Sequence, residues 1–125
     1  MEQTEKHAYV DLYNSFLSDY KRGMVSGEEV GEAIVRLAGY FGEYNIKLVS
    51  AERSFANVRK TIASSNDEST GKSISSAKAD VLADATNEAN LFNIAKAHLQ
   101  NIEQYINALK ALQKGVLNEY AHSSM

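Results

Sequence analysis

Apolar residues recur at alternating steps of four and three between Ser26 and Ile62. This spacing is typical of one face of a long amphipathic helix with a near-heptad period, and it predicts a helix over residues 27–63. The stripe consists of Val30, Ile34, Leu37, Phe41, Tyr44, Leu48, Ala51, Phe55, Val58 and Ile62. A helix of this length needs an equally long partner to cover its stripe, so the pattern predicts a second long helix.

The second long helix is predicted over residues 87–120. Its stripe consists of Leu91, Ala95, His98, Ile102, Tyr105, Leu109, Leu112 and Val116, and it is widened by Leu99, Ile106, Leu117 and Tyr120. A helix that is apolar on two sides is buried inside a bundle or in a subunit interface. We therefore expect an oligomer with His98, Ile106 and Leu117 at the interface between subunits.

Two shorter helices complete the prediction, which is an all-α fold forming an elongated helical bundle. The first covers residues 4–24, and its apolar face consists of Tyr9, Val10, Tyr13, Phe16, Leu17, Tyr20 and Met24. Ser26 and Glu29 have the spacing of a capping box that begins the long helix. The second short helix covers residues 75–85, with Ile74, Ala77, Val81 and Leu82 as its apolar side. We expect a break at residues 85–87 before the last helix.

Glycine and polar residues predict the irregular parts of a single helical domain over residues 1–125. Residues 64–73 contain no apolar side chain, which predicts an exposed loop. Gly39 and Gly42 lie inside the first long helix, where each costs about 1 kcal/mol relative to alanine. We therefore expect a close approach of a neighbouring backbone, or a bend, at these glycines. Residues 122–125 are expected to form a frayed tail.

Composition and charge limit the functional classes. The chain has no cysteine, which excludes disulfides, thiolate metal sites and a thiol nucleophile. Its net charge of −3 argues against nucleic-acid binding over the whole surface but allows a local basic face. No apolar run approaches the roughly 20 residues of a membrane span, and the polar N-terminus does not resemble a secretory signal. We expect a cytoplasmic protein without a membrane partner.

Motifs for catalysis and for cofactors are incomplete. Residues 71–73 (Gly-Lys-Ser) match the end of a phosphate-binding loop, but Asn66 occupies the position of its first glycine and no buried strand precedes it. None of the paired carboxylates, which are Asp80 and Asp84 and the group Glu28, Glu29 and Glu32, stands beside a histidine in the Glu-x-x-His arrangement of di-iron bundles. His98 is expected to be a hydrogen-bonded core residue or to set the register, with a ligand or catalytic role as the alternative. We predict no enzyme activity, no metal and no cofactor.

Basic residues gather between positions 47 and 78. The candidate nucleic-acid-binding residues are Lys47, Arg53, Arg59, Lys60 and Lys72. Arg53 and Lys60 are seven residues apart and share an outer stripe of the first long helix. Such side chains can bind phosphates, and in an oligomer their weak contacts would add as avidity. An ordinary solvated helix face is the alternative interpretation.

The second half of the chain resembles UvsY-type phage recombination mediators. The run KSISSAKADVLADATNEANLFNIAKAHLQNIEQYINALKALQKGVLNEYA shares their layout: a Ser/Thr-Lys-rich loop, a short helix, a kink and a long terminal helix ending near an aromatic residue. The resemblance covers residues 53–120. It implies a non-enzymatic, all-α oligomer that binds single-stranded DNA and helps to load a recombinase. The family's DNA-binding residues would correspond to Arg53, Arg59, Lys60 and Lys72.

Two classes of function follow from these observations. The first is an oligomeric helical accessory protein whose partners are itself, single-stranded DNA and a recombinase, in the cytoplasm of a phage-infected host cell. The second is a phage-type protein-interaction module: a virion component, an adaptor, or an inhibitor of a host or defence protein. A sponge for a small signalling molecule at an oligomer interface is a further alternative.

Overall fold

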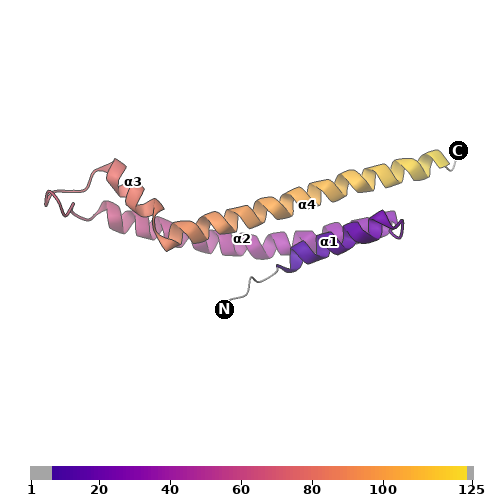
Figure 1. The fold of residues 1–125 in the computed structure, drawn as a ribbon, viewed down its shortest axis with the longest axis horizontal. Helices are drawn as coiled ribbons and strands as arrows, with labels where there is room; N and C mark the ends of the chain where they lie inside the picture. The colour runs from indigo at the N-terminus through magenta and orange to yellow at the C-terminus, as the bar shows by residue number, and fades with distance from the viewer. Residues whose placement is uncertain (1–6, 124–125) are drawn as a thin grey trace. The chain divides into compact units, whose positions relative to one another are not determined.

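A computed structural model describes residues 7–123 of the chain, and the side chains as far as residue 115. Within this range the fold has no strand and comprises the helices α1 (Ala8–Lys21), α2 (Gly27–Ala63), α3 (Ser76–Asp84) and α4 (Asn87–Ser123) (Figure 1). The predicted all-α fold of two long and two short helices is confirmed. None of the described helices is long and apolar enough to cross a membrane.

Local capping residues set where the long helices begin. Ser26 Oγ accepts a hydrogen bond from the Glu29 N–H at 3.2 Å, and Glu29 Oε1 accepts one from the Ser26 N–H at 3.0 Å. This is the predicted capping box, and α2 begins directly after it. Thr86 Oγ1 accepts from the Ala89 N–H at 3.2 Å. Thr86 therefore caps α4, and the helical structure is interrupted between α3 and α4 as expected.

The outer ends of the predicted helices differ from the structure. Helix α1 spans Ala8–Lys21 rather than residues 4–24, and residues 4–6 lie outside the described range. It ends early because Gly23 adopts a φ of 74°, which lets the Met24 N–H donate to the Asp19 carbonyl at 3.1 Å. Helix α4 continues to Ser123, so residues 122 and 123 of the expected frayed tail are helical. Residues 124–125 are outside the described range.

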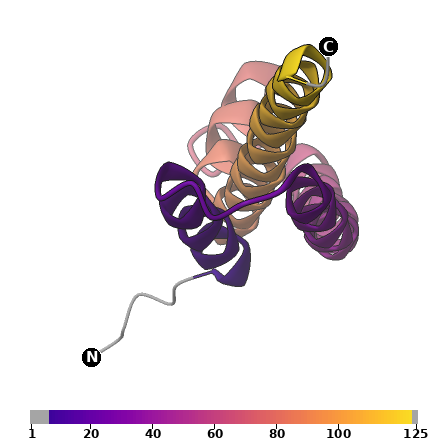
Figure 2. The same cartoon turned by 90° about the vertical axis from the view of Figure 1, so that its right-hand side faces the viewer.

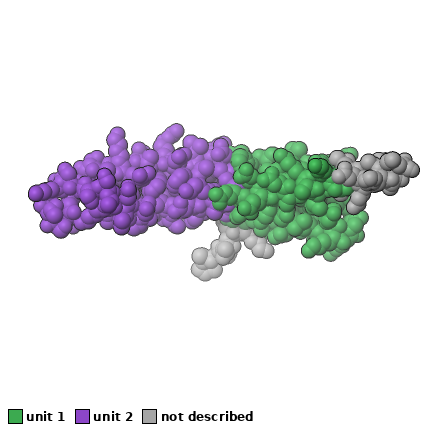
Figure 3. Space-filling view, turned by 90° about the horizontal axis from the view of Figure 1, so that it is seen from above, with its two compact units in different colours: residues 1–42, 100–125 green, residues 43–99 purple. Residues whose placement is uncertain are grey.

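The chain divides into two compact units, which Figure 3 shows in different colours. Unit 1 is Met1–Gly42 with Gln100–Met125, and unit 2 is Glu43–Leu99. The sequence predicted one domain over residues 1–125. Helix α1 belongs to unit 1 and α3 to unit 2, whereas α2 and α4 each contribute a segment to both units.

Unit 1 contains the largest fully buried side chains. They come from all three helices of the unit: Tyr9, Val30, Leu37, Ile102 and Leu109. Helix α1 lies beside α4 (Figure 2), and the Tyr13 ring stacks on the Tyr105 ring with centroids 3.9 Å apart. This unit therefore has a conventional core, in which interdigitated aliphatic and aromatic residues hold the helices together.

Unit 2 has a core of small side chains. Helices α2 and α4 run antiparallel here, because Tyr44 pairs with His98 at 5.2 Å between ring centroids and Phe55 with Phe92 at 5.6 Å. The buried side chains of the unit are Tyr44, Ala79, Ala83, Ala89, Ala95 and Leu99. Four of these six are alanine, and Tyr44 and Leu99 each keep 8% of their surface exposed.

The predicted apolar face of α3 is wrong. The helix buries Ala79 and Ala83, whereas Val81 and Leu82 are 68% and 44% exposed. A helix of nine residues is too short for periodicity to separate one face from another. The alanine face is buried because small side chains let helices approach closely. Leu91, predicted to begin the stripe of α4, is likewise 50% exposed.

The glycines of α2 do not mark a close approach within the described chain. Gly39 and Gly42 are exposed, and no described atom lies within 4 Å of the position that a Cβ would take at either. The expected approach of another described backbone segment is therefore wrong. Gly31 differs, because a Cβ there would lie 3.1 Å from Gln113 Nε2.

Candidate nucleic-acid interface

All five predicted nucleic-acid-binding residues lie in unit 2. Four are on the second half of α2, and Lys72 is in the loop between α2 and α3. Unit 2 has seven acidic and seven basic residues, whereas unit 1 has nine acidic and six basic ones. The net charge of −3 therefore belongs to unit 1. Unit 2 is neutral as a whole, so its own net charge does not repel a polyanion.

Helical rotation points the four candidate basic residues of α2 in three directions. At about 100° per residue, Arg53 and Lys60 lie opposite the apolar stripe of α2, while Lys47 and Arg59 lie on its two flanks. Arg53 and Lys60 are exposed, and neither forms an ion pair with another described side chain. These two residues are therefore cations of α2 that face solvent and form no ion pair with a described side chain.

Arg59 is held weakly between two neighbours. Its Nη2 atom is 3.6 Å from Asp80 Oδ1 on α3, and both side chains are more than half exposed. Its guanidinium carbon is 5.6 Å from the centroid of the Phe55 ring. An exposed ion pair of this kind contributes about 0–1 kcal/mol. Arg59 can thus leave Asp80 for a stronger acceptor, such as a phosphate.

A shallow hollow of about 290 Å³ lies beside Arg59 and Lys60. Its other lining residues are Ala56, Ala63, Ala79 and Asp80. The three alanines leave open space next to the two cations, and Asp80 is its one acidic residue. A phosphate group could enter this hollow, where it would compete with Asp80 for the Arg59 guanidinium.

Lys47 is separated from the other cations. Its Nζ atom lies 4.6 Å from the centroid of the Tyr44 ring. It lines a second hollow of about 540 Å³, which we call the α2–α4 groove, together with Ile46, Ser50, Ala51, Ser54, Glu88 and Leu91. The structure therefore does not bring Lys47 together with Arg53 and Lys60, and its role in nucleic-acid binding stays a prediction.

The loop between α2 and α3 is closed by its own backbone. Asn66 and Ser73 form an isolated bridge, and the Asp67 N–H donates to the Lys72 carbonyl at 2.6 Å. Gly71 adopts a φ of 69°, a conformation that glycine reaches without steric cost. Residues 64–73 are exposed except Asp67, which is partly buried. The loop is therefore exposed but ordered by hydrogen bonds.

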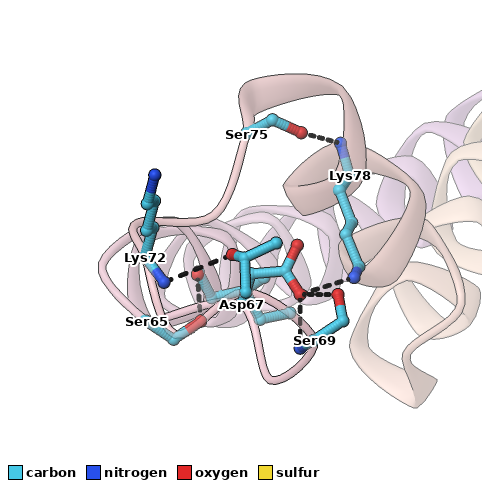
Figure 4. Close-up of polar contacts among 8 residues, drawn as sticks. Ser65, Asp67, Ser69, Lys72, Ser75 and Lys78 are labelled. Carbon is cyan, nitrogen blue, oxygen red and sulfur yellow. Dashed lines mark hydrogen bonds and ion pairs between the residues drawn. The ribbon is translucent and has the colours of Figure 1, made fainter.

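Asp67 is the centre of the loop (Figure 4). Its Oδ1 atom accepts hydrogen bonds from Lys78 Nζ at 2.8 Å, from Ser69 Oγ at 2.7 Å and from the Ser69 N–H at 2.9 Å. These donors, with Lys78 first, lower the pKa of Asp67 to about 2. Lys78 is thereby occupied, whereas the Lys72 side chain extends away from the carboxylate (Figure 4). Lys72 is the loop cation available to a phosphate.

We expect the Asp67 carboxyl group to titrate near pH 2 in the folded protein rather than at its ordinary pKa of 3.8. Because folding lowers this pKa, the resulting stabilisation is complete above the ordinary value and is lost as the pH falls through the folded one. Carbon-detected NMR of the side chain measures the titration. Lys78→Ala should bring the pKa back toward 3.8, and Lys72→Ala should leave it unchanged. A pKa that does not respond to Lys78→Ala would contradict the ion pair.

The predicted subunit-interface residues are only partly described. His98 and Ile106 are half-buried within the single chain, and the His98 ring packs beside Tyr44. The Leu117 side chain lies outside the described part of the structure. The interface role of these three residues stays a prediction. Among the residues that the structure describes, no three His, Cys, Asp or Glu side chains come together as a metal site.

Sequence reasoning missed the acidic partners of the basic region. Asp80 pairs with Arg59, and Asp67 pairs with Lys78. Both pairs join different segments of the chain, so helical spacing contains no signal for the first. The Asp-x-Ser turn of residues 67–69 was a local signal for the second, because Asp side chains commonly accept hydrogen bonds from the backbone two residues later.

Comparisons of the chain with protein-family models, with curated proteins and with solved structures find no match.

Proposed function

We propose that this protein is a non-enzymatic accessory protein that binds single-stranded DNA through the outward face of α2 in unit 2. The observation that carries the proposal is the position of Arg53 and Lys60. Both are exposed, both lie opposite the apolar stripe, and neither has an ion-pair partner among the described side chains. Charged side chains in such a position are not packed in the core, so they can contact a polyanion.

Arg59 and Lys72 extend this face. Arg59 contributes from the hollow beside Lys60, once a phosphate displaces Asp80. Lys72 contributes from the loop. Phosphate contacts position a strand without reading its sequence. We therefore expect binding that tolerates sequence, depends strongly on salt and is weak for one copy of the chain.

The resemblance of residues 53–120 to UvsY-type mediators supports a biological setting for this activity. In that setting the protein acts as a homo-oligomer in the host-cell cytoplasm and helps a recombinase to load onto single-stranded DNA. Weak binding per subunit suits such a role, because several copies that engage one strand gain affinity by avidity.

The double variant Arg53→Ala/Lys60→Ala tests the proposal. Anisotropy of a labelled oligothymidine should show weaker binding, and the salt slope should fall by about 0.7 for each phosphate that the variant no longer neutralises. Helical content and stability should hold, because surface substitutions usually cost within about 0.5 kcal/mol each. The matched control is Lys110→Ala/Lys114→Ala, which removes the same charge from exposed positions of unit 1.

Two results would contradict this proposal. One is an absence of binding by the unmodified protein at low salt, which would favour the protein-interaction alternative. The other is an equal loss of affinity in the two double variants, because net charge rather than the Arg53–Lys60 face would then explain binding.

A further inference from the structure

Unit 2 exposes several of its large apolar side chains. Ile46 and Val49 on α2 are 72% and 46% exposed, and Leu91 and Ile94 on α4 are 50% and 45% exposed. The buried side chains of the same unit are mostly alanine. Where large apolar side chains lie together in water, they usually mark a surface that another protein covers.

Two of these exposed side chains lie in the α2–α4 groove. Ile46 and Leu91 both line it, and Ser50, Ala51 and Ser54 are the small residues beside them. The groove therefore offers both a protruding side chain and a depression that can receive one. It also contains one base, Lys47 on α2, and one acid, Glu88 on α4.

We propose that a second copy of this chain docks on the α2–α4 groove about a two-fold axis. A two-fold interface places the same surface on both sides, so the surface must be complementary to itself. Ile46 of one copy can enter the depression beside Ser50 and Ser54 of the other, in the manner of knobs into holes. The same operation pairs Lys47 of each copy with Glu88 of the other.

Charge also favours a second copy at this surface. Unit 2 has equal numbers of acidic and basic residues, whereas unit 1 has three more acidic than basic ones. Two copies that meet through unit 2 therefore bring together surfaces of a unit without net charge, whereas unit 1 surfaces would repel each other. The inference does not depend on nucleic-acid binding, although a dimer would double the number of Arg53–Lys60 faces.

Charge reversal tests the pairing directly. Lys47→Glu gives copies with two acids in the groove, and Glu88→Lys gives copies with two bases. Each variant alone should dimerise at least about tenfold more weakly, because like charges then face each other. Mixing the two variants should restore dimers of wild-type affinity, since every pair across the axis is again opposite in charge. Contacts within one chain cannot produce this rescue.

The measurement is the mass of the full-length protein by light scattering, over a range of concentrations and without DNA. The unmodified protein should have twice the 13.8 kDa mass of one chain. Ile46→Glu should give monomers with unchanged helical content. Val81→Glu is the matched control, because Val81 is 68% exposed in the same unit but does not line the groove.

Three results would overturn the inference: a monomeric unmodified protein at the highest concentrations, charge variants that dimerise normally, or a mixture no more associated than its components. Loss of DNA binding with dimers intact would count against the proposed function alone. Because the mass is measured without DNA, the two proposals can fail separately.

Discussion

Replacing Leu109 with alanine is expected to lower the free energy of unfolding by about 2–5 kcal/mol. Leu109 has no exposed surface and lies in the core of unit 1. The substitution removes buried methyl groups and leaves a cavity that packed helices cannot fully close. Such a loss is a large share of the total, because domains of this size are stable by about 5–15 kcal/mol. Urea denaturation followed by circular dichroism measures it.

Leu112→Ala is the control for that experiment. Leu112 lies on the same helix but is only half-buried. Leu112→Ala makes the same chemical change at a position where folding removes less surface from water. It should therefore lower the free energy of unfolding by a clearly smaller amount. Equal losses in the two variants would show that Leu109 is not the better buried residue.

Replacing Gly39 and Gly42 together with alanine is expected to stabilise the protein by about 2 kcal/mol, since each interior helical glycine costs about 1 kcal/mol relative to alanine. A Cβ at either position meets no described atom within 4 Å. The added methyl groups therefore reduce the entropy of the unfolded chain without causing a clash. Thermal and urea denaturation both report the gain.

Gly23→Ala should have the opposite sign. Gly23 ends α1 with a φ of 74°, a conformation that strains any residue with a Cβ. If Gly39→Ala/Gly42→Ala instead destabilises the protein or lowers its mass in solution, another chain approaches α2 at these glycines. That outcome would place a subunit contact on this stretch of α2.

The long helices could be predicted because their signals are local. Helix α2 spans Gly27–Ala63, as the alternating apolar spacing predicted, and its capping box lies within four consecutive residues. The Arg53–Lys60 stripe was predictable for the same reason, because a separation of seven residues fixes a shared helix face.

Features that depend on a neighbouring segment could not be predicted. Helix α3 buries Ala79 rather than Val81 because small side chains let it approach its neighbouring helices closely. Arg59 was predicted to bind nucleic acid together with Lys60, but Asp80 on another helix gives it an ion-pair partner. The groove that contains Lys47 likewise exists only because α4 brings Glu88 and Leu91 beside α2.

The alanine core of unit 2 limits how this protein can diverge in evolution. In unit 1, a residue such as Leu37 can be exchanged for another large apolar residue, because cores tolerate swaps that conserve volume. At Ala79, Ala83, Ala89 and Ala95, which are at most 8% exposed, nearly every replacement adds volume and forces the helices apart. Distant relatives should therefore keep small residues at these four positions while the large exposed side chains around them change.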